Sequence, residues 1–186
     1  HEAKYWKRLG SNVQCLLCPF KCLIKEGKRG NCNVRMNMSG RLVTLVYGRT
    51  CARHIDPIEK KPVFHLLPGS KAYSIATPGC NLGCKFCQNW QISQTLPEKI
   101  DTEYFSPEDV VNDAIKNKCE SIAYTYTEPT IFYEYVLETA KLAKRKGIRN
   151  VMVTAGYINT EPLKELLPFF DVIKVDLKGF NLEFYN

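Results

Sequence analysis

The sequence lacks an apolar stretch long enough to span a bilayer, and no secretory leader is visible at its start. It also lacks the interleaved aromatic and basic residues on which nucleic-acid bases stack, although its formal net charge is +7. The clearest basic run, residues 141–146, falls at the end of a predicted helix, where positive charge complements the helix dipole. These absences favour a cytoplasmic protein without a membrane role, and the length allows one core with a small appendage.

Histidine is scarce, with three in 186 residues. His54 and His65 fall in a predicted loop, where a lone histidine is more often a surface residue than a ligand, so both are minor candidates. Cysteine is abundant, with nine in the chain. All except Cys51 and Cys119 form two close groups, which is typical of metal ligation rather than of the disulfides of secreted proteins.

One group of cysteines follows a short apolar run, residues 72–76, that we interpret as a buried strand. Its members, in C-x3-C-x2-C spacing, are Cys80, Cys84 and Cys87. Three thiolates can bind three irons of a 4Fe-4S cluster, and the fourth iron is then open to a small molecule. A ferredoxin-like cluster or a structural zinc site remains an alternative, but both need a fourth ligand, and Cys119 lies far downstream.

The other group lies near the N-terminus in C-x2-C-x3-C-x9-C spacing and comprises Cys15, Cys18, Cys22 and Cys32. This segment is rich in glycine and lysine and has little apolar material, so a metal would supply the missing folding free energy. Four sulfur ligands suit either tetrahedral zinc or an auxiliary 4Fe-4S cluster, and the sequence does not separate them. Four cysteines saturate a metal ion and leave no open coordination position, which favours zinc slightly.

The pattern predicts two domains. Residues 1–68 combine the Cys-rich metal knuckle with a β-hairpin, whose strands 33–38 and 41–47 join at Ser39 and Gly40, and an irregular connector over 48–68. Residues 69–186 alternate strand and helix, which predicts an α/β fold with parallel strands.

The predicted strands of the second domain are residues 72–76, 121–126, 151–154 and 172–177. The predicted helices are residues 107–118, 130–146 and 160–169, with Ser106 and Thr160 as caps and Gly147 as a stop. In the first of these helices, the residues expected to face inward are Val110, Val111, Ala114 and Ile115.

The cysteine loop over residues 77–90 reads T-P-G-C-N-L-G-C-K-F-C-Q-N-W. With the aromatic Phe86 just before its last cysteine, it resembles the signature loop of radical S-adenosylmethionine (SAM) enzymes, and its flanks are similar to the pyruvate formate-lyase activating enzyme branch. Along the chain, C-L-L-C-P, E-G-K-R-G-N-C, D-P-I-E-K-K-P and P-G-S follow in an order that closely resembles the radical SAM proteins of the AmmeMemoRadiSam group.

The resemblance implies that the open iron chelates SAM and that one electron splits SAM into methionine and a 5′-deoxyadenosyl radical, which abstracts hydrogen. It also implies an open, TIM-like (β/α)6 barrel, of which this chain has four βα units. Two further units are expected, so we expect the chain to be a fragment. Closure of the four-stranded unit by a partner chain is a less favoured alternative, because an exposed sheet edge invites aggregation.

The same resemblance implies cofactor contacts. Phe86 is expected to pack near adenine, while Glu128, within T-Y-T-E-P, occupies the place of the family's G-G-E-P motif and suits an amine. A helix-start acid is an equally good interpretation of Glu128. Asp176 and Lys178 match the family's D-L-K, with a surface ion pair as the alternative. Ala155 stands where the family usually has Asn, so any contact from that Asn is lost.

The implied partners are an electron donor, such as a ferredoxin or flavodoxin, and an unknown protein, RNA or small-molecule substrate. Glycyl-radical activation of a protein is one implied reaction, and the group's name points to Memo-like and AMMECR-like proteins as associates. The alternative from a different class is a non-catalytic iron-sulfur or zinc module that binds nucleic acid or a protein. SAM binding would separate the two, since a structural module should show none.

Overall fold

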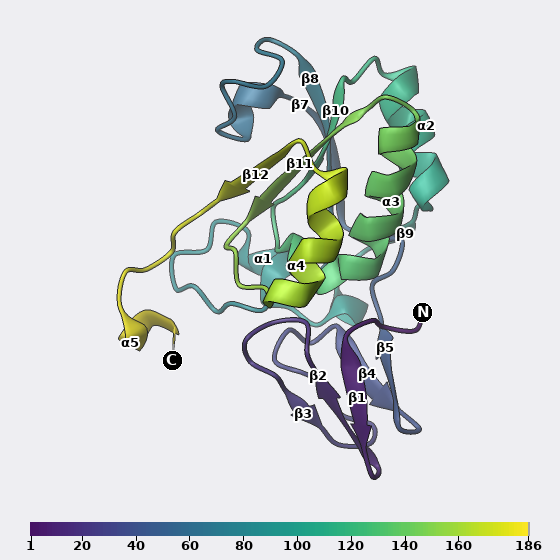
Figure 1. The fold of residues 1–186 in the computed structure, drawn as a ribbon, viewed down its shortest axis with the longest axis vertical. Coiled ribbons are helices and arrows are strands. Elements are labelled where there is room, and N and C mark those ends of the chain that lie inside the picture. The colour runs from purple at the N-terminus through teal and green to yellow at the C-terminus, as the bar shows by residue number, and fades with distance from the viewer. Residues whose placement is uncertain (186) are drawn as a thin grey trace.

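The computed structural model describes residues 1–185, and the side chains of residues 1–183. A β-rich N-terminal part lies below an α/β part in Figure 1. The N-terminal part contains a sheet of β1 (Trp6–Leu9), β2 (Asn12–Cys15) and β3 (Leu23–Ile24), and a hairpin of β4 (Arg35–Met38) and β5 (Arg41–Thr44). The hairpin and its turn were predicted correctly; the first sheet was not predicted, because its strands are short and carry few hydrophobic residues.

A five-stranded mixed sheet forms the α/β part, in the order β12-β11-β10-β8-β7. Its strands are β7 (Ala52–Pro57), β8 (Lys71–Ala76), β10 (Ser121–Tyr124), β11 (Arg149–Thr154) and β12 (Val172–Val175). The strands from β8 to β12 run parallel, whereas β7 pairs with β8 in the antiparallel direction. Within residues 1–185 the sheet does not close into a barrel.

The prediction of an irregular connector over residues 48–68 is wrong, because residues 52–57 form the edge strand β7. Its inward-facing, buried residue is Asp56 rather than a hydrophobic one, so the apolar alternation of a strand is missing. The segment also contains β6 (Arg49–Thr50), which pairs with β9 (Glu103–Tyr104), and the short helix η1 (Ile58–Lys60). The domain division at residue 68 stays a prediction. The pairing of β7 with β8 argues for a boundary nearer residue 50, because it places residues 52–57 in the sheet of the second domain. The last residue of the predicted second domain, 186, lies outside the described residues.

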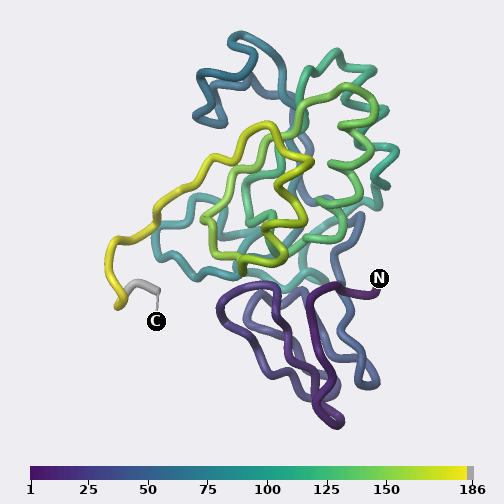
Figure 2. The backbone as a smooth tube through the Cα atoms, in the orientation of Figure 1, coloured from purple at the N-terminus to yellow at the C-terminus, as the bar shows by residue number. Residues whose placement is uncertain are grey.

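Helices α2 (Pro107–Lys116) and α3 (Tyr133–Arg145) lie together beside the sheet in both ribbon and tube views (Figures 1 and 2). The other helices are α1 (Trp90–Ser93), η2 (Pro97–Lys99), η3 (Pro129–Phe132), α4 (Thr160–Leu166), η4 (Leu167–Phe169) and α5 (Leu182–Tyr185). No helix within the described part of the chain is long and apolar enough to cross a membrane.

Two details of the helix predictions are wrong. Ile115 is 49% exposed, because the stripe of α2 that packs on the core consists of Val110, Val111 and Ala114. Asn159, not Thr160, is the N-cap of α4, and its side-chain amide instead donates to backbone carbonyls of the N-terminal part at 2.7 and 3.1 Å. The predicted cap of α2 is confirmed, since Ser106 forms a capping box with Asp109.

Alternate residues of the sheet face two different environments. Tyr73 and Ile75 of β8 belong to the large core that includes α2, α3 and the N-terminal part. Ala72 belongs to a small second cluster, with Ala123 and Val151, that residues of the 58–66 segment cover. At the carboxyl ends of the strands, the residues that follow on this second face are largely polar.

Candidate functional site

A cavity of about 690 Å³ opens at the carboxyl ends of the parallel strands. This is the edge where parallel α/β sheets bind ligands, and the volume is within the range of cofactor pockets. Every residue predicted for the open cluster and for SAM lines it, namely Cys80, Cys84, Cys87, Phe86, Glu128, Asp176 and Lys178. Because they come from loops after different strands, the fold brings together what the sequence separates.

The cysteine loop lies in a turn that packs its thiols against one wall of this cavity. The backbone N–H of Cys87 donates to the Cys84 carbonyl at 3.1 Å, and the Cys87 thiol lies 3.2 Å from the Ser93 hydroxyl. Burial, together with the nearby charges of Glu128 and the other two cysteines, raises the pKa of Cys80 to about 12. Burial also raises the pKa of Cys84, while Lys178 acts in the opposite direction.

The donor set fits an iron-sulfur cluster better than a lone ion. Within residues 1–185, no three histidine, cysteine, aspartate or glutamate side chains are arranged to hold a metal ion as they stand, and this holds for both groups of cysteines. Three thiols beside an open cavity of about 690 Å³ leave room for a cluster with a small molecule against its unliganded side. Cys80, Cys84 and Cys87 would supply the thiolates, and the assignment of ligands stays a prediction.

Glu128 is 1% exposed and already accepts four hydrogen bonds. One carboxylate oxygen accepts from the Thr130 N–H at 3.1 Å and from the hydroxyls of Thr130 and Thr154 at 2.7 and 2.6 Å. The other accepts from the Ala155 N–H at 2.8 Å. Glu128 therefore caps η3, as the helix-start interpretation proposed, and also joins it to the loop after β11.

Asp176 is the centre of a small ion cluster at the end of β12. It accepts from the Lys178 ammonium at 2.8 Å and forms a second ion pair with Lys174. Lys174 was not predicted, and burial and the charge of Lys178 lower its pKa. The part of the cavity formed by the end of β12 therefore carries two ammonium groups. Phe86, 61% exposed, lies at the rim of the same cavity.

Sequence reasoning also missed a buried network on the floor of the cavity. Asp56 accepts from Lys61 at 2.7 Å, from the Tyr126 hydroxyl at 2.5 Å and from the Ser74 hydroxyl at 2.9 Å. Both Lys61 and Tyr126 line the cavity. The D-P-I-E-K-K-P motif contains Asp56 and Lys61 and could have pointed to this network. Its prediction as part of an irregular loop gave no reason to expect a buried carboxylate there. Tyr126 has φ +67°, a strained value for a non-glycine residue, and such strain is concentrated at functional sites.

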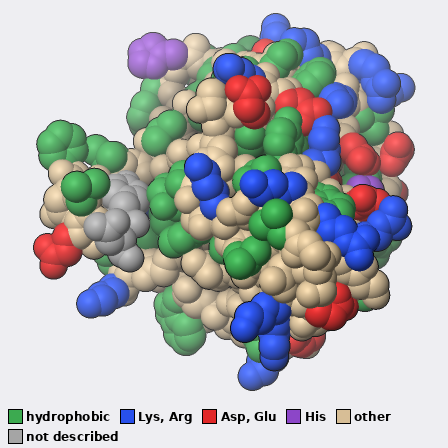
Figure 3. Space-filling model, turned by 60° about the horizontal axis from the view of Figure 1, so that its bottom comes forward, with side chains coloured by type: hydrophobic (Ala, Val, Ile, Leu, Met, Phe, Trp, Pro, Cys, Tyr) green, Lys and Arg blue, Asp and Glu red, His purple; other side chains and the backbone are tan. Residues whose placement is uncertain are grey.

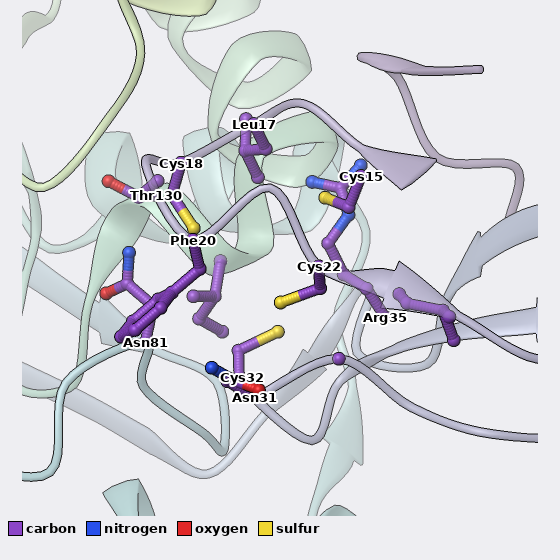
Figure 4. Close-up of a pocket in the computed structure, with 13 residues that line it drawn as sticks. Cys15, Leu17, Cys18, Phe20, Cys22, Asn31, Cys32, Arg35, Asn81 and Thr130 are labelled. Atoms are coloured by element: carbon purple, nitrogen blue, oxygen red, sulfur yellow. The ribbon is translucent and has the colours of Figure 1, made fainter. Parts of the chain in front are cut away.

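The second group of cysteines, Cys15, Cys18, Cys22 and Cys32, lines one small cavity of about 20 Å³ (Figure 4). The turn is closed by a hydrogen bond from Lys21 N–H to Cys18 carbonyl, 3.1 Å, and Cys15 N–H donates to Cys22 carbonyl at 3.0 Å. Burial raises the pKa of Cys15 and Cys18, and that of Cys32 to about 11. His54 and His65 do not line either cavity.

Comparison with known proteins agrees with this geometry. Residues 74–186, more than half of the chain, match the radical SAM superfamily. The protein belongs to this superfamily, whose members are α/β enzymes that use a 4Fe-4S cluster and SAM.

Two relatives come from Methanocaldococcus jannaschii. The uncharacterized protein MJ0808 is 47% identical over 186 residues, which cover 100% of this chain and 55% of that protein. The uncharacterized protein MJ0674 is 27% identical over 176 residues, which cover 91% of this chain and 46% of that protein. The chain thus spans about half the length of these curated relatives.

Proposed function

We propose that Cys80, Cys84 and Cys87 bind the 4Fe-4S cluster and that the protein reductively cleaves SAM to abstract hydrogen from a substrate. The observation that carries this proposal is that all three cysteines share one cavity with the residues predicted to contact SAM. The cluster and SAM would supply a 5′-deoxyadenosyl radical. The chain's own residues would bind and orient the cluster and SAM and would exclude water from the cavity.

The residues predicted to contact SAM have different surroundings, and we propose a different role for each. Lys178 and Asp176 reach the cavity from β12 and are suited to the carboxylate and amine of SAM. Phe86 offers an exposed ring at the rim for adenine. Glu128 shapes the pocket from behind, because its oxygens are taken by four donors, and we propose that any contact with SAM adds to this role.

We further propose that the parallel strands are the first four of an open (β/α)6 barrel in a longer protein of the AmmeMemoRadiSam group, similar to pyruvate formate-lyase activating enzymes. The relatives' greater length supports the additional units. None of the nine cysteines, all of which lie within the described residues, forms a disulfide, and a cytoplasmic location is part of the same proposal. A ferredoxin or flavodoxin as electron donor, and Memo-like or AMMECR-like associates, are part of the same proposal.

The test is anaerobic reconstitution of the full-length protein with iron and sulfide, reduction with dithionite, and assay for 5′-deoxyadenosine from SAM. Wild-type protein should form the product, and Cys84→Ala should abolish it. Cys119→Ala is the matched control, because that thiol is buried in the core away from the cavity. Absence of product from cluster-loaded protein would overturn the proposal.

That outcome would favour the alternative of a structural module that binds nucleic acid. The face shown in Figure 3 gives this alternative little support. On the face shown in Figure 3, lysine and arginine side chains lie in separate groups among acidic, apolar and neutral atoms. A continuous basic stripe is the usual electrostatic footprint of nucleic-acid binding.

A further inference from the structure

The four cysteines of the second cavity precede the region that matches the radical SAM superfamily, which begins at residue 74. In Figure 4 the sulfurs of Cys18, Cys22 and Cys32 point toward a common space, with Cys15 at its edge. We propose that these four thiols bind a single structural zinc ion, with Arg35 as the residue that balances its charge. This inference does not depend on the SAM chemistry.

The small size of the cavity favours zinc over an auxiliary cluster. About 20 Å³ is roughly the space of one water molecule, and beside the cysteines and a few polar residues the wall is formed by Leu17, Phe20, Ile24 and Ile131. Within the described residues the four thiols do not hold a metal as they stand, so a zinc ion with sulfurs at about 2.3 Å requires their side chains to move together. A cubane of four irons and four sulfides needs more space than a single ion.

Arg35 is the independent observation that points to an anion in this cavity. Its side chain is buried and donates from one guanidinium nitrogen to Glu134, at 2.8 Å, and to the Lys4 carbonyl, at 2.6 Å. The other two guanidinium nitrogens are buried without a partner, and Arg35 lines the cysteine cavity. Unpaired buried donors of a charged group are costly. Zinc with four thiolates carries excess negative charge, so its sulfurs are suitable acceptors for these donors.

The proposed zinc centre also supports the other cysteine loop from behind. Asn81, next to Cys80, lines the zinc cavity and donates to the Tyr157 carbonyl at 2.9 Å. A Cβ added to Gly79 would lie 2.9 Å from the Cys32 carbonyl oxygen and 2.5 Å from Val34. The two cysteine motifs are therefore packed directly against each other, so order in one constrains the other.

The test measures metals in full-length protein, both wild type and the triple variant Cys80→Ala, Cys84→Ala, Cys87→Ala, which leaves the N-terminal cysteines intact. We expect about one zinc per chain in both proteins and loss of iron from the triple variant. Iron and a 4Fe-4S electron paramagnetic resonance signal that persist in the triple variant would overturn the proposal. Absence of bound metal after zinc loading of the triple variant would overturn it as well.

The role of Arg35 is tested by chelator competition. Because Arg35→Met alone would leave Glu134 buried and unpaired, the variant combines Arg35→Met with Glu134→Leu. Zinc affinity should fall about 10- to 100-fold, the usual cost of losing an outer-shell partner, and the charge-transfer band of the cobalt-substituted protein should shift. Arg149→Met, which removes an exposed ion pair with Asp171, is the control. Unchanged affinity and spectrum would remove Arg35 from the site.

Discussion

At the scale of single residues, the site depends on buried polar side chains that form several hydrogen bonds within the protein. Glu128 is the clearest example, since one buried carboxylate organises two loops of the cavity. The residues around it, Thr130 and Thr154, have side chains that point at it rather than at a ligand. A residue placed by family resemblance in contact with a cofactor can therefore act chiefly by shaping the pocket.

We predict that Glu128→Ala lowers the free energy of unfolding by about 3 kcal/mol or more, because it leaves several buried donors without acceptors. Urea denaturation measures the change. Glu161→Ala, at an exposed pair with Lys164, should cost less than about 0.5 kcal/mol. If Glu128 served only to contact SAM, stability would be unchanged while SAM affinity fell.

At the scale of elements, Asp56 ties the edge strand β7 to its surroundings. Its carboxylate accepts hydrogen bonds from Lys60 at the end of η1 and from Lys61 just after it, from Ser74 of β8, and from Tyr126 in the segment after β10. Burial alone would raise the pKa of Asp56, but these hydrogen bonds hold it well below its ordinary value. The charged form is therefore the one that stabilises the fold.

The sign of the pH dependence follows. A carboxylate with a lowered pKa in the folded state contributes stability above its unfolded pKa, about 3.9, and loses that contribution as the pH falls below it. Asp56→Asn should destabilise the protein by about 2–4 kcal/mol at pH 7, and the difference from wild type should shrink progressively as the pH falls below about 4. Urea midpoints at several pH values measure this, with the exposed Asp101→Asn as control. A difference independent of pH would contradict the assignment.

At the scale of the whole molecule, the N-terminal part and the α/β part share one core and meet at the two cysteine motifs. Val13, Leu17 and Val34 pack in the same cluster as Ile131 and Tyr133. Gly79 lies at the closest point, with φ +98°, a value that residues with a side chain rarely adopt.

Gly79→Ala should therefore destabilise the protein, lower its zinc content and reduce 5′-deoxyadenosine formation together. Gly69→Ala is the matched control, because Gly69 has φ +78° but nothing lies within 4 Å of its added Cβ. The control should cost about 1 kcal/mol from backbone strain alone, and Gly79→Ala clearly more. Thermal unfolding, metal analysis and product assay on both variants measure the effect. Equal effects in the two variants would show that the close approach has no consequence.

The sequence by itself determined both groups of cysteines, the alternation of strands and helices, the hairpin and the cap of α2. Each of these depends on residues close together in the chain, where periodicity, spacing and capping chemistry act locally. The loop after β8 was predicted correctly for the same reason, since a strand followed at once by clustered cysteines needs no distant partner to be recognised.

Only the tertiary structure decided how these pieces meet. The pairing of β7 with β8 and the bond from Tyr126 to Asp56, 70 positions away, depend on contacts that no local pattern encodes. Glu128 likewise acquires its acceptor role from Ala155, 27 positions along the chain. The unpaired donors of Arg35 beside four thiols became visible only after folding had buried them. Buried polar groups are recognised by their partners, and the fold alone supplies those partners.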